Sequence, residues 1–203
     1  MNRSSAVALL SLLFALLGGG GCTPPPPPTL YVLQAPEAVA PAARPNPDRG
    51  GHRLAVALGP VTVPDYLDRT DIVRRAGDNR LDLGADERWA EPLRSGLQRL
   101  LIALLADRLG PGYWVTGGAG RAGQLEIEVP VDIEAFEEDA GGQAVLAATW
   151  EVRAGGRVAR ERTGYRRAVG SGRVEDRVRA LSADVADLAA DLAAAIRAQG
   201  RDR

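Results

Sequence analysis

The chain has 203 residues, of which 45% are hydrophobic, and its 25 basic and 26 acidic side chains give a formal net charge of −1 at pH 7. This balance argues against nucleic-acid binding, which calls for a strongly basic surface. With one cysteine and one histidine, the chain has no intramolecular disulfide and no Cys–His pair for a metal or for catalysis.

Residues 1–21 predict a secretory signal that ends before Cys22. Arg3 is followed by an apolar run, Ala6 to Leu17, and then by small residues, which is the order found in signal peptides. The run is shorter than the roughly 20 residues that a spanning helix needs. The pattern resembles a bacterial lipobox, in which the cysteine is acylated and becomes the mature N-terminus. Glycine replaces the usual leucine three positions before the cysteine, so a plain signal peptide or a membrane anchor with an incidental free cysteine is the alternative.

The residue after the cysteine is Thr23. Under the sorting rule for lipoproteins, aspartate at this position retains the protein at the inner membrane, so Thr23 predicts the outer membrane. Acyl chains on Cys22 would hold the protein at a membrane surface without a spanning helix, and no other cofactor is predicted. Removal of residues 1–21 takes away only Arg3 among the charged residues, which changes the net charge from −1 to −2.

Five prolines, Pro24 to Pro28, follow the predicted anchor. A proline run adopts an extended polyproline II conformation, which here predicts a stiff spacer of about 15 Å. We expect residues 22–29 to form the acylated linker and residues 30–199 to form one domain.

The first half of this domain predicts four strands and a helix. Strands are expected at residues 29–34, 53–64, 71–77 and 79–84, with a bend at Gly59-Pro60 and a turn at Gly77-Asp78. A leucine stripe with Trp89 four residues before its first member predicts an amphipathic helix that ends at Gly110-Pro111. The stripe consists of Leu93, Leu97, Leu100 and Leu104.

The second half predicts four strands and a final helix. Strands are expected at residues 113–116, 124–136, 142–155 and 156–170, and a helix at residues 174–198. Glycines at 141–142 and 155–156 predict that the last three strands form an antiparallel meander. The sequence therefore predicts a single α/β (α+β) domain, with one mixed, largely antiparallel sheet packed by two long helices.

No motif predicts catalysis or a metal site. His52 lies in a glycine-rich loop, and no serine lies in the GxSxG pattern. "GAGRAG", residues 118–123, matches a dinucleotide-binding motif, but a predicted strand follows it where that motif needs a helix. Asp65, Asp68 and Asp71 lack the alternating spacing of an EF-hand loop.

Charge is distributed unevenly between two segments. Residues 126–139 contain seven acids and no base, whereas residues 157–173 contain six arginines and one acid. One interpretation is that the solvated outer faces of two strands complement one another, with little energy in each pair. The other is that the arginine strand meets an anionic partner such as lipid headgroups.

The block "GPVTVPDYLDRTDIVRR", residues 59–75, is followed by "NRLDL" and "RWAEPL". Together with Cys22 and "YVL" at residues 31–33, it resembles the PqiC (YmbA-like) family of auxiliary lipoproteins in ABC-type and MCE-type intermembrane transport systems. The C-terminal third matches that family only in general character.

The resemblance implies a fold like the N-terminal domain of TolB and an outer-membrane lipoprotein that faces the periplasm. It implies a non-catalytic accessory role in envelope integrity beside an MCE-domain protein that carries lipid between the membranes. Assembly as a homo-oligomer around that partner is left open. The alternatives are a lipoprotein chaperone for another outer-membrane complex and a surface hydrolase that uses His52.

Residues 63–75 of the matched block, "VPDYLDRTDIVRR", have two interpretations. In the structural one, a turn at Pro64-Asp65 is anchored to the core by Tyr66 and Leu67. In the functional one, the stretch contacts a protein partner. The docking candidates are Asp65, Tyr66, Asp68, Arg69, Arg74 and, in "RWAEPL", Trp89.

Overall fold

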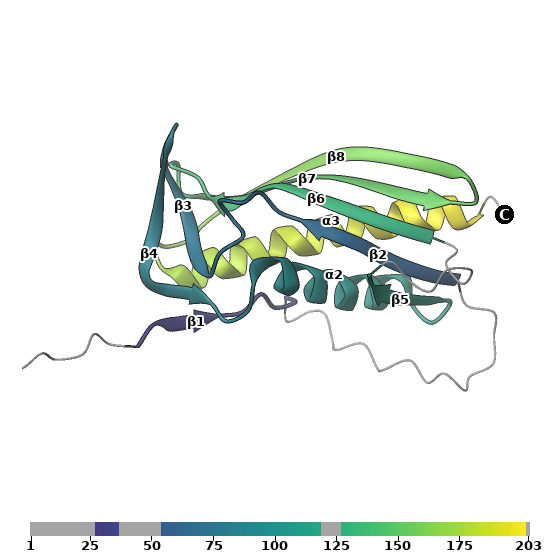
Figure 1. Cartoon of the computed structure of the whole chain (residues 1–203), viewed down its shortest axis with the longest axis horizontal. Coiled ribbons are helices and arrows are strands. Elements are labelled where there is room, and N and C mark those ends of the chain that lie inside the picture. Colours follow the sequence, from purple (N-terminus) through teal and green to yellow (C-terminus); the bar gives the residue numbers. More distant parts are fainter. Residues whose placement is uncertain (1–26, 37–53, 119–126, 202–203) are drawn as a thin grey trace, which may run out of the picture.

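The computed structural model describes residues 27–36, 54–118 and 127–201. Within these residues, eight strands form one mixed sheet, and two long helices lie against one of its faces (Figure 1). The predictions for the signal peptide, Cys22 and His52 fall outside the described residues.

The order of the elements is the predicted one. The strands are β1 (Thr29–Tyr31), β2 (Leu54–Thr62), β3 (Asp71–Gly77), β4 (Arg80–Trp89), β5 (Tyr113–Gly117), β6 (Ile127–Glu138), β7 (Gln143–Ala154) and β8 (Arg157–Ala168). The helices are α2 (Leu93–Leu109), between β4 and β5, and α3 (Val174–Arg201), after β8. The predicted fold class, a mixed α+β domain with two long helices, is confirmed.

Strand β6 joins the two parts of the sheet. One of its edges pairs antiparallel with β7, and β7 pairs antiparallel with β8, which is the predicted meander. The other edge pairs parallel with β2, which in turn pairs parallel with β5. The antiparallel β3–β4 hairpin meets β6 at the pair Arg74 and Glu138, and β1 adds in parallel to the end of β4.

The predicted irregularity at Gly59-Pro60 is present. The register of β2 on β6 shifts between Leu58 and Val61, as expected where a proline cannot donate a hydrogen bond to the ladder. A Cβ atom on Gly59 would lie 3.2 Å from the backbone of Pro130 in β6. The close approach of these two strands therefore depends on the absence of a side chain at residue 59.

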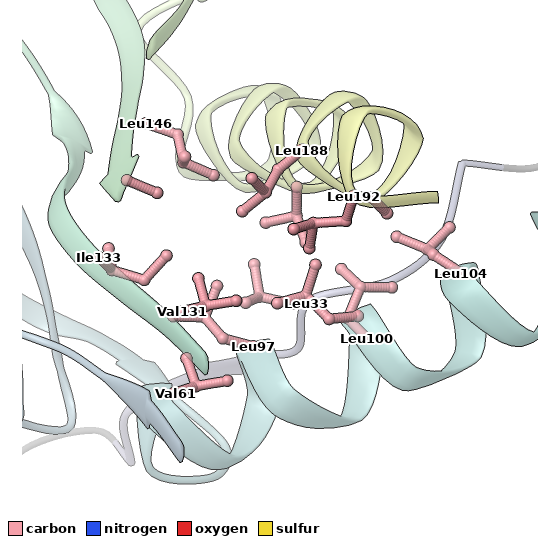
Figure 2. Packing of buried hydrophobic residues seen from close by; sticks show 14 of the residues in the cluster. Leu33, Val61, Leu97, Leu100, Leu104, Val131, Ile133, Leu146, Leu188 and Leu192 are labelled. Atoms are coloured by element: carbon pink, nitrogen blue, oxygen red, sulfur yellow. The ribbon is translucent and has the colours of Figure 1, made fainter. Parts of the chain in front are cut away.

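The core lies between the helices and the inner face of the sheet. Helix α2 contributes the predicted stripe of buried leucines, and α3 contributes a second stripe of buried apolar side chains. Figure 2 shows Leu33 between the two helices, beside Leu97, Leu100 and Leu192. Each such side chain contributes about 1.5–3 kcal/mol when it is fully buried rather than exposed. The buried residues of the α3 stripe are Val174, Val178, Leu181, Val185, Leu188, Leu192 and Ile196.

Trp89 differs from its predicted place on the leucine stripe. It is the last residue of β4, and α2 begins only at Leu93, after Pro92 at the N-cap position. The backbone N–H of Trp89 donates to the carbonyl of Thr70 at 2.7 Å, and its ring packs against Phe136 with centroids 6.3 Å apart. The strand therefore extends five residues beyond the predicted end at residue 84.

Candidate functional site

An open groove with a volume of about 620 Å³ lies between β1, with the residues that follow it, and the first turns of α3. Leu30 and Val32 line it and are 60% and 38% exposed, respectively. Val178, Arg179 and Ser182 line it from α3. The groove thus combines exposed apolar side chains from the N-terminal segment with a mixed surface from the last helix.

The residues after β1 are held in place by contacts with both helices. Leu33 is buried between α2 and α3. Its carbonyl accepts a hydrogen bond from Arg99 Nη2 of α2 at 2.9 Å, and the N–H of Gln34 donates to Ser182 Oγ of α3 at 3.3 Å. Arg99 is itself held by Glu91 Oε1 at 2.6 Å. Both helices therefore position the segment that forms one wall of the groove.

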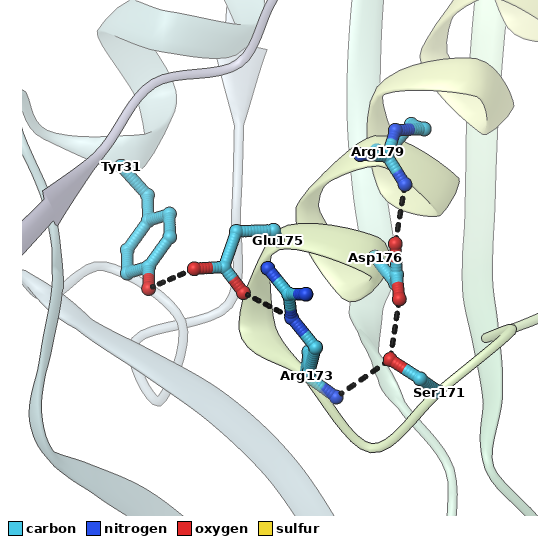
Figure 3. Close-up of polar contacts among 6 residues, drawn as sticks. All are labelled: Tyr31, Ser171, Arg173, Glu175, Asp176 and Arg179. Atoms are coloured by element: carbon cyan, nitrogen blue, oxygen red, sulfur yellow. Dashed lines mark hydrogen bonds and ion pairs between the residues drawn. The ribbon is translucent and has the colours of Figure 1, made fainter.

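Tyr31 and Glu175 both line the groove, and their side chains contact one another (Figure 3). The Tyr31 hydroxyl donates to Glu175 Oε1 at 3.4 Å, and Arg173 Nε lies 3.4 Å from Glu175 Oε2. A hydrogen bond from the backbone of Glu175, together with Arg173, holds the pKa of the Glu175 carboxyl below its usual value. Burial and the nearby carboxylate raise the pKa of Tyr31. At neutral pH the carboxylate is charged and the tyrosine is neutral.

A second polar cluster lies at the start of α3 (Figure 3). The Ser171 hydroxyl donates to Asp176, which also pairs with Arg179, and the backbone N–H of Arg173 donates to Ser171 Oγ at 3.3 Å. The bond from Ser171, followed by that from Arg179, lowers the pKa of Asp176. Acids in the first turn also match the positive N-terminal end of the helix dipole. Together, the two clusters contain two acids, Glu175 and Asp176, and two arginines, Arg173 and Arg179. Their net charge is therefore zero.

The turn after β2, residues 63–70, is built as the structural interpretation predicts. The backbone N–H groups of Leu67 and Asp68 both donate to the carbonyl of Pro64, at 2.9 and 3.1 Å. Leu67 is fully buried, and Tyr66 is partly buried against the core. The predicted anchoring of this docking turn, as we call residues 63–70, by Tyr66 and Leu67 is confirmed.

The charged candidates of the docking turn are exposed, and two of them make ion pairs, one close and one long. Asp65 is exposed at the start of the turn. Asp68 Oδ2 lies 2.5 Å from Arg94 Nη2 at the start of α2, and Arg69 Nε lies 3.7 Å from Asp71 Oδ2. The turn thus presents charges to solvent while its apolar side chains are held in the core.

The two other candidates have opposite environments. Arg74 is exposed on β3 and pairs with Asp82 of β4 at 3.1 Å. Trp89 is only 6% exposed, with its ring in the core. Because its ring is covered by the fold, Trp89 does not belong to a surface that a partner can reach.

Two glutamates that the sequence places in the acidic run are buried. Glu137 Oε1 lies 2.6 Å from Arg75 Nη2, and Glu138 forms an ion pair with Arg177 of α3. Burial and a hydrogen bond to Glu137 raise the pKa of Tyr66 to about 12. The description of this whole acidic run as a solvated face is therefore wrong at its end.

The physical reason is an irregularity in β6. Up to Ile133 the strand alternates as predicted, with apolar residues toward the helices. The register on β7 then shifts between Ile133 and Ala135, so that Phe136 and Glu138 share the helix-facing side while Glu137 points the other way. Each of the adjacent glutamates meets its own arginine. No local pattern marks this shift, and the arginines come from distant segments of the chain.

Strand β8 carries exposed arginines on the side of the sheet away from the helices, and we call Arg160, Arg162 and Arg166 the arginine face. Each pairs with an acid of a neighbouring strand or turn. The pairs are Arg160 with Glu151 (3.5 Å), Arg162 with Glu134 (2.6 Å) and Arg166 with Asp139 (2.8 Å). The acidic and basic segments complement one another in this way, but the guanidinium groups stay largely exposed and accessible to an anionic partner.

Across residues 27–36, 54–118 and 127–201, no three His, Cys, Asp or Glu side chains group into a metal-binding set. No helix in the same ranges has the length and hydropathy needed to cross a bilayer. The described surfaces present the groove beside β1, the exposed charges of residues 63–70 and the arginine face.

The fold belongs to a class seen in solved structures. An uncharacterized protein superimposes with a TM-score of 0.68 and 22% identity over 84% of this chain and 99% of that one. A DUF330-family protein from Xanthomonas campestris gives 0.65 and 16% over 86% and 98%. At these identities the likeness shows the fold alone.

The chain belongs to the family of ABC-type transport auxiliary lipoprotein components, whose model matches residues 31–193. Curated relatives include the intermembrane transport lipoprotein PqiC of Escherichia coli (strain K12) and of Shigella flexneri, each 30% identical over 100 residues. The matched stretch covers 49% of this chain and 51% of the relative, so the chain spans about half the length of the curated relatives it matches. The resemblance to the PqiC-like family is confirmed.

Proposed function

We propose that the protein is an outer-membrane lipoprotein that faces the periplasm and acts as a non-catalytic accessory subunit of an MCE/ABC-type intermembrane lipid transport system. The observation that carries this proposal is the family match over residues 31–193, which begins shortly after the predicted acylation site, Cys22. The curated relatives named as intermembrane transport lipoproteins support the same system.

The architecture suits a positioning role. A domain on a stiff proline spacer can hold a partner at a fixed distance from the membrane and needs no chemical step. Chain connectivity places the N-terminal segment near the anchor, and Leu33 fixes that segment to both helices. We propose that an MCE-domain protein is the partner that the domain holds.

The docking turn and β3 provide the proposed contact surface for that partner. The surface exposes four charged side chains, those of Asp65, Asp68, Arg69 and Arg74. The buried side chain of Leu67 fixes the turn to the core. Exposed charges contribute to the rate and specificity of association more than to folding stability. Substitution of these charged residues should therefore change the stability of the fold only slightly.

A charge reversal tests this surface. Arg69→Glu should reduce recovery of the MCE-domain protein by about tenfold in co-purification after mild detergent extraction, because a reversed charge at a contact costs on the order of 1–2 kcal/mol. Its melting temperature should stay within about 2 °C of wild type, since the 3.7 Å pair with Asp71 is exposed and weak.

Arg80→Glu is the matched control, because Arg80 also makes a single 3.7 Å pair, with Asp82, on the adjacent hairpin. It should leave recovery unchanged. A large fall in the melting temperature of Arg69→Glu would show that the residue serves the fold instead. Failure of the wild-type protein to enrich any MCE-domain protein would contradict the proposed function itself.

A further inference from the structure

We infer that the groove side of the molecule rests on the membrane, with Leu30 and Val32 in the lipid interface and the arginine face directed away from it. The inference rests on the proposed function, because it takes Cys22 to be acylated. It assigns a lipid surface, rather than a protein, to the groove between β1 and α3.

Chain length limits where the groove can lie. Pro27, the first described residue, follows Cys22 by five residues. A chain spans at most about 3.6 Å per residue, so Pro27 lies within about 18 Å of the point where the acyl chains would be attached. Strand β1 begins two residues later, at Thr29. Of the described elements, β1 is thus the one nearest to the proposed anchor along the chain.

The segment nearest the anchor exposes two large apolar side chains, with the polar Thr29 and Gln34 beside them. Leu30 and Val32 are two of five large hydrophobic side chains exposed in the described part of the chain, and both line the groove with Ala35 and Pro36. Apolar side chains at a lipid interface gain from burial in proportion to the area covered. Because the anchor makes this contact intramolecular, even a contact that is weak in isolation is populated.

The charge of the groove is balanced. Arg173 and Arg179 beside it pair with Glu175 and Asp176, so the cluster adds no net charge. A contact made by this side should therefore not need anionic lipid and should not weaken with salt. A contact made by the arginine face would need anionic lipid and would weaken with salt, since attraction to a charged surface is screened within a Debye length.

The two faces cannot meet one flat membrane together. In Figure 1 both helices lie between β1 and β8. The segment after β1 binds to both helices, through Leu33 to α2 and through Gln34 to α3, on the side of the helices away from β8. The arginine face, Arg160, Arg162 and Arg166, projects from the opposite, helix-free side of the sheet, where each of the three pairs with an acid of β6, β7 or the turn between them. A molecule that rests on its groove side therefore presents the arginine face to the periplasm.

A fluorescent probe at residue 30 tests the orientation in the full-length, acylated protein. Cys22 is the only cysteine, and its thiol is consumed by acylation, so Leu30→Cys provides a single labelling site. The labelled protein is reconstituted in phosphatidylcholine vesicles that carry a doxyl group on an acyl chain. Val158→Cys is the matched control, because Val158 on β8 is 59% exposed, against 60% for Leu30.

We expect quenching of at least about twofold for the probe at residue 30 and almost none at residue 158, unchanged by high salt. Equal quenching at both positions, or quenching at residue 158 alone, would overturn the inference. Flotation of the protein with the vesicles is measured in the same samples. Loss of flotation would overturn the inference together with the proposed anchor, whereas flotation without quenching at residue 30 would overturn the inference alone.

Discussion

Asp184 of α3 illustrates how a single buried carboxyl can link the last helix to the edge of the sheet. Its side chain is fully buried, with Arg167 Nε of β8 at 3.1 Å from Oδ1, and Arg167 also contacts Asp187 at 2.6 Å. Burial raises the pKa of Asp184 to about 6, although the attraction of Arg167 acts in the opposite direction. Burial of the charge thus outweighs its pairing.

This raised pKa predicts a pH-dependent stability. The folded carboxyl keeps its proton to a higher pH than the unfolded one, whose pKa is near 3.8, so its contribution is present below about pH 4 and lost as the pH rises through about 6. The gap corresponds to about 3 kcal/mol. About two thirds of this gap falls between pH 4.5 and pH 7.5, so over that range Asp184→Asn should gain about 2 kcal/mol over wild type in free energy of unfolding, measured by urea denaturation. Asp187→Asn, at an exposed position beside it, should show a smaller change, and parallel pH curves for Asp184→Asn and wild type would refute the assignment.

The buried pair of Glu138 and Arg177 predicts a different response. Removal of one partner leaves the other charge buried without compensation, which costs about 3–5 kcal/mol. Arg177→Met should lower the free energy of unfolding by that amount in urea at pH 7, and the double variant with Glu138→Leu should recover most of the loss.

Arg179→Met breaks the exposed pair with Asp176 and serves as the control. It should cost less than about 0.5 kcal/mol. An equal loss for the two single variants would mean that burial does not distinguish the pairs.

At the scale of elements, the β2–β6 junction depends on Gly59. A Cβ atom there would lie 3.2 Å from the backbone of Pro130 in a central strand, where neither strand can move freely. Gly59→Ala should lower the free energy of unfolding by about 1–3 kcal/mol, the usual cost of overpacking. The control is Gly77→Ala, since a Cβ atom at Gly77 has nothing within 4 Å. Thermal melts compare the two, and equal stability of both variants would contradict a close junction.

The elements themselves were predictable because their signals are local. Alternation in β6 and the leucine spacing of α2 each arise within about a dozen residues, and the two-residue hairpin turn between β7 and β8 follows from Gly155-Gly156, both of which have positive φ. Trp89 shows the limit: its spacing from Leu93 also fits a helix, but Pro92 and the pairing of β1 with β4 keep residue 89 in a strand.

The groove could not be predicted, because its walls are distant in sequence. Gln34 and Ser182, which meet across it, are separated by 148 residues, and nothing local in either segment indicates the other. The structure of the turn at residues 63–70 was predictable because its residues are contiguous in sequence, whereas its role in docking stays a prediction. Glu137 and Glu138 were misplaced because a one-residue shift in strand register decides which side each one takes.

At the scale of the whole molecule, the two sides of the domain have different characters. The helix side carries the N-terminal segment and the groove, and the sheet side carries exposed ion pairs between β6, β7 and β8 (Figure 1). An accessory subunit between a membrane and a protein partner needs two such surfaces. The groove side exposes Leu30 and Val32 beside balanced ion pairs, and the sheet side exposes the arginine face.

The burial of Leu33 decides how a force on the N-terminal segment reaches the domain. Once Cys22 is acylated, the chain enters the hydrophobic core only eleven residues after the lipid. Any force that lifts the domain from the bilayer then acts directly on Leu33 and on the bonds that Arg99 and Gln34 make to this segment. A force exerted by the partner would therefore act on α2 and α3 together, through these two hydrogen bonds. In the proposed arrangement, the domain would be a stiff connection between membrane and partner, and it would yield first at the contact between its N-terminal segment and its two helices.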